Sequence, residues 1–323
     1  MLNVSRRTLL LSAAVAGAAL GLDKRLALIT SAEAQTTPDP AVGFAKYKVG
    51  DVEITALYDG IFEKPHDPAF IKNASVDEVK AAMTAAGNPA DFVSIPLTVV
   101  VLEIGGKYIL CDSGSGGQWQ PTAGKLAANM AAAGIDPAKI STILVSHFHP
   151  DHIFGLMQKD TNAAVYPNAE IIVHSNEYKW WMEPGRVEKL PEARKKLGAR
   201  IQSVFSGWKN IRQVEAETEV VPGVRFVSMP GHTAGHVAFH LSSGNDQLII
   251  SNDTCYVPAL NVAHPGWHGA YDQDGPLAEA SRRSLMDRVV ADKVKICGSH
   301  FPFPGLATIA KDGANYALTT TKI

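Results

Sequence analysis

The stretch Ser146-His147-Phe148-His149-Pro150-Asp151-His152 places three imidazoles and one carboxylate within six residues. It directly follows the apolar run Ile143-Leu144-Val145, which predicts a buried strand that delivers these side chains into a loop. His147 and His149 are two positions apart, so in an extended chain they point to the same side. Imidazole nitrogens and carboxylate oxygens are common ligands of zinc and similar divalent ions. The stretch therefore predicts a metal site at the end of a strand.

Other polar side chains follow the ends of other predicted strands. They are Asp112 after residues 107–111, His232 after 224–229, Asp253 and Tyr256 after 247–251, and His300 after 294–297. Because strand ends gather along one edge in layered α/β folds, we expect these side chains to converge. Apolar strands that end in a motif, with helices between them, predict an α/β protein in which helices cover mixed sheets.

The converging side chains suffice for a dinuclear metal site. Two neighbouring ions require about six or seven protein ligands, and one carboxylate can bridge them. The chain offers three ligands for the first ion, three for the second and one bridging carboxylate: His147, His149 and His232; Asp151, His152 and His300; and Asp253. We expect Asp112 to accept a hydrogen bond from a ligand imidazole and so to fix its tautomer.

These motifs resemble those of the metallo-β-lactamase-fold hydrolases. The resemblance rests on His147-x-His149-x-Asp151-His152, Gly231-His232-Thr233, Asp253 and His300, and it covers nearly all of the chain after residue 34. Segments such as Tyr166-Pro167-Asn168-Ala169 are similar to the methyl parathion hydrolase branch. The resemblance implies an αββα four-layer sandwich, the same metal ligands, and hydrolysis of lactones, esters or phosphotriesters.

Tyr256 helps to choose among these substrates. It lies three residues after Asp253, a spacing that resembles the N-acyl homoserine lactonases of the superfamily, in which this tyrosine lies over the substrate carbonyl. The resemblance thus favours a lactone or carboxylic ester. The expected mechanism is attack by a metal-bridging hydroxide, with Tyr256 donating a hydrogen bond to the oxyanion and Asp151 or Asp253 carrying the proton. The alternative role for Tyr256 is a wall of the pocket.

Aromatic side chains close to the motifs are predicted to form the substrate pocket. They are Trp119, Phe148, Trp181, Tyr256 and Trp267. A pocket lined in this way favours an apolar or aryl substrate. The basic residues 186–206 have a helical pattern, which we interpret as a solvated outer face.

The remaining features concern export and composition. Ser5-Arg6-Arg7-Thr8-Leu9-Leu10 precedes an apolar segment, and Ala32-Glu33-Ala34 predicts cleavage, so residues 1–34 are interpreted as a twin-arginine signal peptide of a periplasmic protein. Residues 35–323 are expected to form a single domain with no membrane span. The chain has 46% hydrophobic and 19% charged residues and a net charge of -2, which gives no indication of nucleic-acid binding. The three cysteines are expected to be buried apolar side chains.

Several alternatives stay open. An organophosphate triesterase would use the same metals, and a β-lactamase would need a cation for the drug carboxylate, which we do not identify in the sequence. A non-catalytic periplasmic metal-binding protein is the third alternative. Zinc is favoured by the ligand types, although iron, manganese or cobalt would also fit. A homodimer is compatible with the resemblance.

Overall fold

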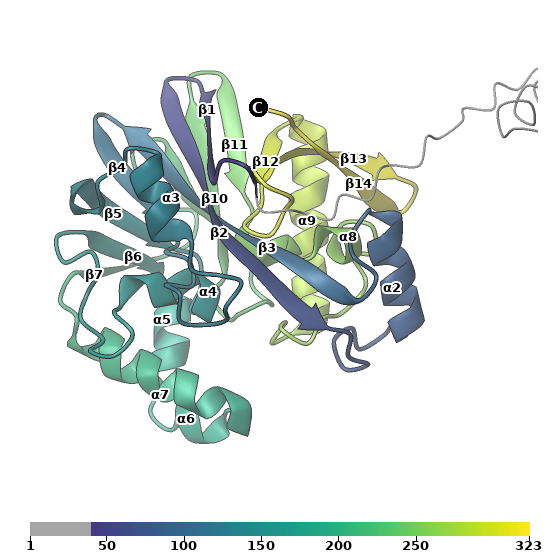
Figure 1. Ribbon diagram of the computed structural model, residues 1–323, viewed down its shortest axis with the longest axis horizontal. Coiled ribbons are helices and arrows are strands. Elements are labelled where there is room, and N and C mark those ends of the chain that lie inside the picture. The colour runs from purple at the N-terminus through teal and green to yellow at the C-terminus, as the bar shows by residue number, and fades with distance from the viewer. Residues whose placement is uncertain (1–39) are drawn as a thin grey trace, which may run out of the picture. The chain divides into compact units, whose positions relative to one another are not determined.

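The computed structural model describes residues 40–323, so the predicted signal peptide lies outside the described residues. Two seven-stranded sheets form the centre of this part of the chain, and each follows the chain order (Figure 1). The first sheet contains β1 (Phe44–Val49), β2 (Val52–Pro65), β3 (Phe92–Ile104), β4 (Lys107–Cys111), β5 (Ile140–Val145), β6 (Glu170–His174) and β7 (Ile211–Val214). The second contains β8 (Glu219–Val221), β9 (Val224–Ser228), β10 (Val237–Ser243), β11 (Asp246–Ile250), β12 (Lys295–Cys297), β13 (Leu306–Asp312) and β14 (Asn315–Thr320).

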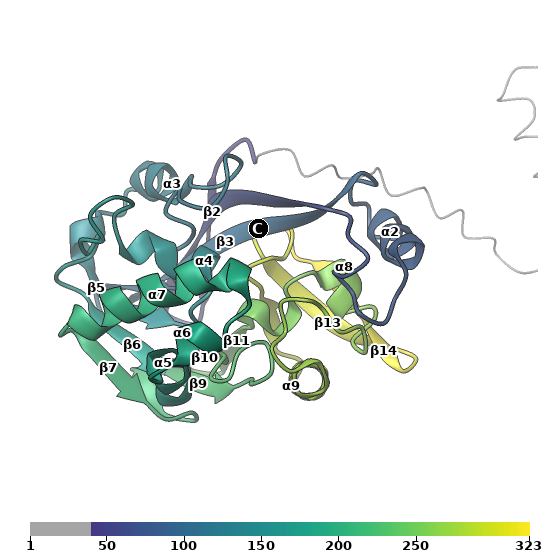
Figure 2. The ribbon, with the colours of Figure 1, turned by 90° about the horizontal axis from the view of Figure 1, so that it is seen from below.

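Helices connect the strands and cover the outer faces of the sheets. They are α2 (Val76–Ala85), α3 (Leu126–Ala132), α4 (Pro150–Ile153), α5 (Ser175–Met182), α6 (Arg186–Lys189), α7 (Glu192–Gly207), α8 (Pro258–Asn261) and α9 (Gly275–Asp292). Short 3₁₀ turns are η1 (Pro137–Lys139), η2 (Phe154–Leu156) and η3 (Asn252–Cys255). Figure 2 shows α5 and α7 on the side of the first sheet and α9 on the side of the second.

The core has three layers of apolar contacts, which β5 illustrates. Ile143 and Val145 belong to the cluster between the first sheet and its helices, whereas Leu144 belongs to the cluster between the two sheets. Strands buried on both faces are apolar at every position, which explains the continuous run in the sequence. Leu285 and Met286 of α9 pack on the other face of the second sheet. The predicted αββα sandwich is therefore confirmed.

The strand directions place the motifs along one edge of the sandwich. Strands β4 and β5 are parallel, and so are β11 and β12. Their C-terminal ends lead directly into Asp112, the histidine stretch, Asp253 and His300. Parallel neighbours deliver the residues that follow them to the same side of a sheet.

Strand β2 is long and irregular. It continues to Pro65 through an irregularity beside Gly60. Gly60 has φ 125°, and a Cβ there would lie 2.2 Å from the Thr122 carbonyl oxygen, so this glycine permits a close approach within a strand. After β12, the strands β13 and β14 form an antiparallel hairpin at the edge of the second sheet.

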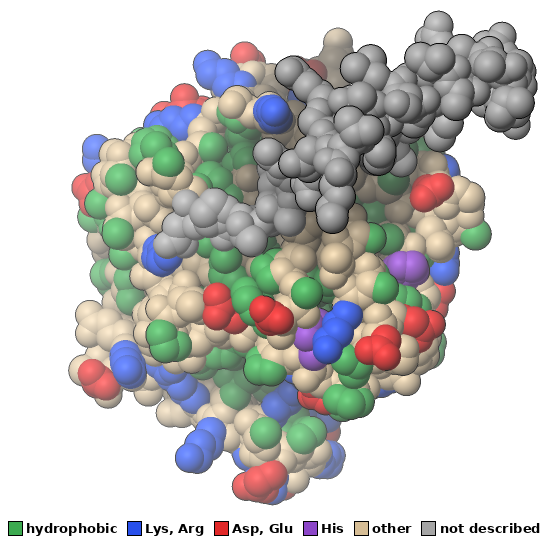
Figure 3. Space-filling view, turned by 45° about the vertical axis from the view of Figure 1, so that its right-hand side comes forward, with side chains coloured by type: hydrophobic (Ala, Val, Ile, Leu, Met, Phe, Trp, Pro, Cys, Tyr) green, Lys and Arg blue, Asp and Glu red, His purple; other side chains and the backbone are tan. Residues whose placement is uncertain are grey.

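Two further observations concern the surface. Acidic and basic side chains of the described residues are interspersed on the face seen in Figure 3. Among residues 40–323, no helix has the length and apolar character required to span a membrane.

Cys111, Cys255 and Cys297 are buried and form no disulfide, as expected for apolar core side chains.

Candidate metal centre

The seven predicted ligands come together at the edge of the sandwich. They form two groups, of which the first contains His147, His149, His232 and Asp253 and the second contains Asp151, His152 and His300. Within each group, one ligand atom from every residue lies within 4.8 Å of the others. Four separate loops supply these residues, after β5, β9, β11 and β12.

In the first group, three imidazole nitrogens surround one point. His149 Nδ1 lies 3.0 Å from His147 Nε2 and 2.9 Å from His232 Nε2. Both contacts share His149 Nδ1, which offers either one proton or one lone pair. It therefore cannot form a good hydrogen bond to both neighbouring rings at once. Two ligands at about 2.0–2.1 Å from one tetrahedral zinc lie roughly 3.3 Å apart, which is close to the observed spacing.

The second group has the same character. His152 Nε2 and His300 Nε2 each lie 3.5 Å from Asp151 Oδ2. His152 Nε2 has no hydrogen-bond partner although it is buried. A buried, unpartnered ligand atom costs free energy, so this arrangement fits a bound cation.

Asp253 lies between the groups. Its Oδ2 is 3.2 Å from His232 Nε2 and 3.8 Å from His147 Nε2, whereas its Oδ1 is 2.9 Å from His300 Nε2 and 3.1 Å from His152 Nε2. One oxygen thus faces each group, which is the geometry of a bridging carboxylate. The residues present therefore fit two divalent ions.

Most ligand imidazoles are oriented through their second nitrogen. Asp112 Oδ2 lies 2.8 Å from His152 Nδ1, and Asp272 Oδ1 lies 3.0 Å from His232 Nδ1. The Pro96 carbonyl oxygen lies 2.8 Å from His300 Nδ1. These acceptors favour the tautomer that carries its proton on Nδ1 and leaves Nε2 free for a metal. The contact expected for Asp112 is present, whereas the sequence analysis missed Asp272.

Asp272 is itself held by a buried cation. Arg282 is fully buried and lies with Nη2 3.3 Å from Asp272 Oδ2. Its other guanidinium nitrogens donate to the carbonyl oxygens of Thr254 and Pro265 at 2.9 and 2.8 Å. Arg282 therefore compensates the Asp272 charge and fixes the carboxylate behind His232.

A second buried carboxylate, Glu177 of α5, joins two of the ligand loops. Its Oε1 accepts hydrogen bonds from Phe148 N at 3.0 Å and from Trp181 Nε1 at 2.8 Å. Its Oε2 accepts from Thr233 Oγ1 at 2.6 Å and from Gly235 N at 3.0 Å. Phe148 lies between His147 and His149, and Thr233 follows His232, so Glu177 ties both halves of the first group together. The sequence analysis missed Glu177 because three of its four partners are distant in the chain.

The electrostatics of the cluster favour an ionised bridging carboxylate. Burial opposes ionisation of Asp253, but His300 and His152 outweigh it and hold its pKa well below the usual value. Burial and neighbouring imidazoles lower the pKa of His147. For His232, burial is outweighed by Asp253 and Asp272, which raise the pKa to about 9. Metals require an ionised carboxylate and neutral imidazoles, so a metal ion that binds here has to displace the proton that Asp253 and Asp272 stabilise on His232.

A cavity of about 400 Å³ opens over the cluster. It is lined by His149, Asp151, His232, Asp253 and His300 of the cluster, by the apolar and aromatic residues Phe62, Ile95, Trp119, Phe154, Leu197, Tyr256 and Tyr271, and by Pro150, Ala193 and Arg194. The Tyr256 hydroxyl is buried and has no hydrogen-bond partner. A concave, largely apolar site with few polar groups is typical of small-molecule binding.

Three of the predicted pocket residues do not line this cavity. Phe148 is fully buried and stacks on Phe205, with ring centroids 4.4 Å apart, in the helix-covered core. Trp181 is also buried, and its indole nitrogen donates to Glu177. Trp267 packs outside the cavity and stacks on His264 at 4.0 Å. Of the five predicted residues, only Trp119 and Tyr256 are in the lining.

The interpretation of residues 186–206 as a solvated outer face was also incomplete. They form α6 and most of α7, and Ala193, Arg194 and Leu197 of α7 contribute to the cavity wall. Arg194 is thus a cation in the cavity, which the sequence analysis did not identify.

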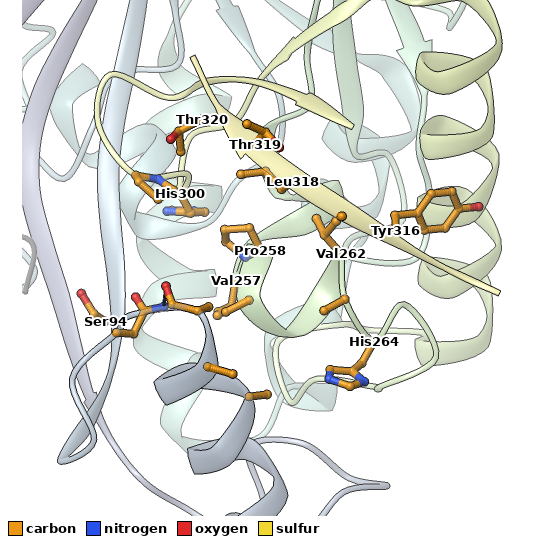
Figure 4. Close-up of a pocket in the computed structure, with 18 of the residues that line it drawn as sticks. Ser94, Val257, Pro258, Val262, His264, His300, Tyr316, Leu318, Thr319 and Thr320 are labelled. Atoms are coloured by element: carbon orange, nitrogen blue, oxygen red, sulfur yellow. Dashed lines mark hydrogen bonds between the residues drawn. The ribbon is translucent and has the colours of Figure 1, made fainter. Parts of the chain in front are cut away.

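A second cavity of about 560 Å³ lies on the other side of His300. Residues of α2, α8 and β14 line it, and Figure 4 shows Val257, Pro258, Leu318 and Thr319 around it. His300 contributes to the walls of both cavities, and its Nδ1 contact with Pro96 fixes the ring between them.

Comparisons with known proteins agree with this geometry. An N-acyl homoserine lactonase of a Bacillus species is 26% identical over 168 residues, which cover 52% of this chain and 58% of that relative. The chain thus matches little more than half of that protein. The solved structure of AidC, a dizinc quorum-quenching lactonase in complex with the product N-hexnoyl-L-homoserine, superposes with a TM-score of 0.82 at 25% identity and covers 87% of this chain and 98% of that one.

Another structure shows the same fold. The hydrolase AbOPH of the beta lactamase superfamily superposes with a TM-score of 0.80 at 23% identity and covers the same shares of the two chains, 87% and 98%. The family model of the metallo-beta-lactamase superfamily matches residues 96–300, which include all seven cluster residues. The chain belongs to the metallo-beta-lactamase superfamily.

Proposed function

We propose that this protein is a dinuclear metal-dependent hydrolase that opens lactones or carboxylic esters. The observation that carries the proposal is the position of Asp253, which offers one oxygen to each group of ligands at the base of a cavity. The similarity to a dizinc lactonase over 87% of the chain supports both zinc and the lactone class. The similarity to an N-acyl homoserine lactonase favours the lactone class over the triesterase alternative.

The proposed ligands are His147, His149 and His232 for the first ion, Asp151, His152 and His300 for the second, and Asp253 between them. When bound, two divalent ions would lower the pKa of a water molecule and polarise the substrate carbonyl. Asp112 and Asp272 hold the ligand imidazoles in the required tautomer.

Tyr256 is the proposed oxyanion donor. Its ring lies beside His232, with centroids 5.2 Å apart, and its hydroxyl has no other partner. Burial raises the pKa of Tyr256 well above its usual value, so the phenol keeps its proton and can donate. Asp151 lines the cavity with little exposure and can pass a proton to the leaving alkoxide.

The decisive experiment joins metal analysis to a substrate panel. Purified protein should contain two metal ions per chain and should hydrolyse lactones and esters faster than phosphotriesters and β-lactams. Asp253→Ala should lose both metal occupancy and turnover. A protein with full metal content that is inert towards all four substrate classes would instead support a metal-binding role without catalysis.

The proposal includes export to the periplasm by the twin-arginine route. It is supported by Arg6-Arg7 ahead of an apolar segment. Replacement of both arginines by lysine should leave the protein in the cytoplasmic fraction with residues 1–34 attached, which fractionation and N-terminal sequencing would reveal.

A further inference from the structure

Arg194 differs from the other arginines of the described chain. Each of the others donates from its side chain to a protein acceptor: Arg186, Arg200, Arg212, Arg225, Arg282, Arg283 and Arg288. Within residues 40–323, the guanidinium of Arg194 has no hydrogen bond or ion pair. Glu192, the acidic residue of the same helix, pairs with Lys195.

This unpaired cation faces the cavity over the metal centre. Arg194 is half-buried and lines the cavity beside Leu197. The same cavity is lined by His149 of the cluster and by Tyr271. Outside the cluster, Arg194 is the one charged residue among those that line this described cavity.

A partly desolvated guanidinium without an acceptor is unfavourable, so a ligand that supplies one gains affinity. The planar fork of arginine matches a carboxylate with two parallel hydrogen bonds and can also donate to an amide carbonyl. The rest of the wall, which includes Phe62, Trp119 and Leu197, accepts apolar groups. The cavity thus combines an apolar surface with one anion-complementary point near the cluster.

We infer that Arg194 selects substrates whose acyl side carries an oxygen acceptor, either a carboxylate or an amide carbonyl, in addition to the scissile lactone or ester. This inference rests on the proposed function and adds the substrate class to it. An alkyl lactone would leave Arg194 unpaired in the complex, whereas a substrate with an acceptor would pair it.

The test uses three lactones of equal length, with an amide, a carboxylate or only an alkyl chain at the same position. For Arg194→Met, kcat/KM should fall about 10- to 100-fold for an acceptor-bearing lactone, as expected for loss of a hydrogen bond to a charged group, and less than about threefold for the alkyl lactone. The lactone that shows the loss identifies whether Arg194 recognises a carboxylate or an amide carbonyl. Arg194→Lys should restore the rate for the carboxylate-bearing lactone better than for the amide-bearing one. Lys196→Met, an exposed cation of the same helix, is the matched control and should change none of the three rates.

Equal losses for all three lactones, or none, would overturn the role of Arg194. If the wild-type protein hydrolyses neither lactones nor carboxylic esters, the proposed function fails, and equilibrium binding still decides the inference. The probes are then the corresponding cyclic ethers, which lack the scissile carbonyl. The acceptor-bearing ethers should bind the metal-loaded wild type at least 10-fold more tightly than Arg194→Met, and equal affinities would refute the selection.

Discussion

Replacement of Glu177 by glutamine and by alanine would measure how far the metal centre depends on a carboxylate that does not touch the proposed ions. Glu177 accepts four hydrogen bonds, two on each oxygen. Glutamine keeps one acceptor oxygen and turns an NH₂ group towards the other pair of donors. The Thr233 hydroxyl can rotate to accept from this group, but the Phe148, Trp181 and Gly235 N–H groups cannot, so the amide nitrogen should face Thr233 and Gly235.

The magnitudes follow from this count. In Glu177→Gln only the Gly235 N–H loses its acceptor. A hydrogen bond to a charged group contributes about 1.5–3 kcal/mol, so we expect the free energy of unfolding to fall by about the same amount. In Glu177→Ala four buried donors lose their acceptor. At the lower limit of about 1 kcal/mol for each, the free energy of unfolding should fall by at least about 4 kcal/mol.

The effect on metal binding should be uneven. Phe148 and Thr233 are neighbours of ligands of the first ion, so Glu177→Gln should weaken metal binding at His147, His149 and His232 more than at His300, whose loop Glu177 does not contact. The assays are urea unfolding and metal content after dialysis against graded chelator. Glu192→Gln, whose side chain is 89% exposed, is the control and should stay within about 0.5 kcal/mol of the wild type. A Glu177→Ala protein with wild-type stability and two tightly bound ions would refute this reasoning.

Three further predictions concern the cavity. Tyr256→Phe should lower kcat about 100-fold with little change in KM, because it removes the proposed oxyanion donor, and an unchanged kcat would assign Tyr256 to the wall. Gly269→Ala should lower kcat similarly, since a Cβ there would lie 1.4 Å from the Tyr256 hydroxyl oxygen and displace it. In steady-state kinetics, adding Gly269→Ala to Tyr256→Phe should cause no further loss of kcat, and additive losses would contradict this coupling. Removal of metal by a chelator should abolish activity. It should also destabilise the fold by about 2.7 kcal/mol for each ion relative to protein at a free metal concentration of 100 times the Kd, which thermal unfolding with and without added zinc would measure.

The convergence of the motifs was predictable because two local rules were enough. Apolar runs indicated buried strands, and the polar residues directly after them had to lie at strand ends. The loops after β5, β9, β11 and β12 therefore could be brought together without knowledge of the intervening helices. The αββα arrangement itself came from the resemblance, since the strand pattern indicated only mixed sheets covered by helices.

The error at Phe148 was avoidable. The argument that places His147 and His149 on one side of an extended chain also places Phe148 on the opposite side. The structure shows this alternation, with Phe148 in the core against Phe205. Trp181 was misplaced for a different reason: its indole donates to Glu177, and no local pattern reveals a buried acceptor four positions earlier.

The residues that sequence analysis missed act through distant contacts. Glu177 reaches Phe148 and Gly235 across 29 and 58 positions, and Asp272 reaches His232 across 40. Arg194 lies on a helix that carries three other basic residues, Lys195, Lys196 and Arg200, so the composition of the segment indicated a surface. The roles of these residues become clear only from their contacts in the folded structure.

These distant acids explain why the candidate site is part of the core. Asp112, Glu177 and Asp272 are buried, and each has protein partners that donate to it or pair with it. Removing one partner of a buried charge costs more than the pair contributes, because the other charge is left without compensation. Arg282 does not line the cavity. Its substitution would therefore leave the Asp272 charge without a compensating cation and would release His232 from its orientation. The ligand loops are consequently held by the same buried interactions that hold the two sheets and their helices together, so stability and metal binding should change together at these positions.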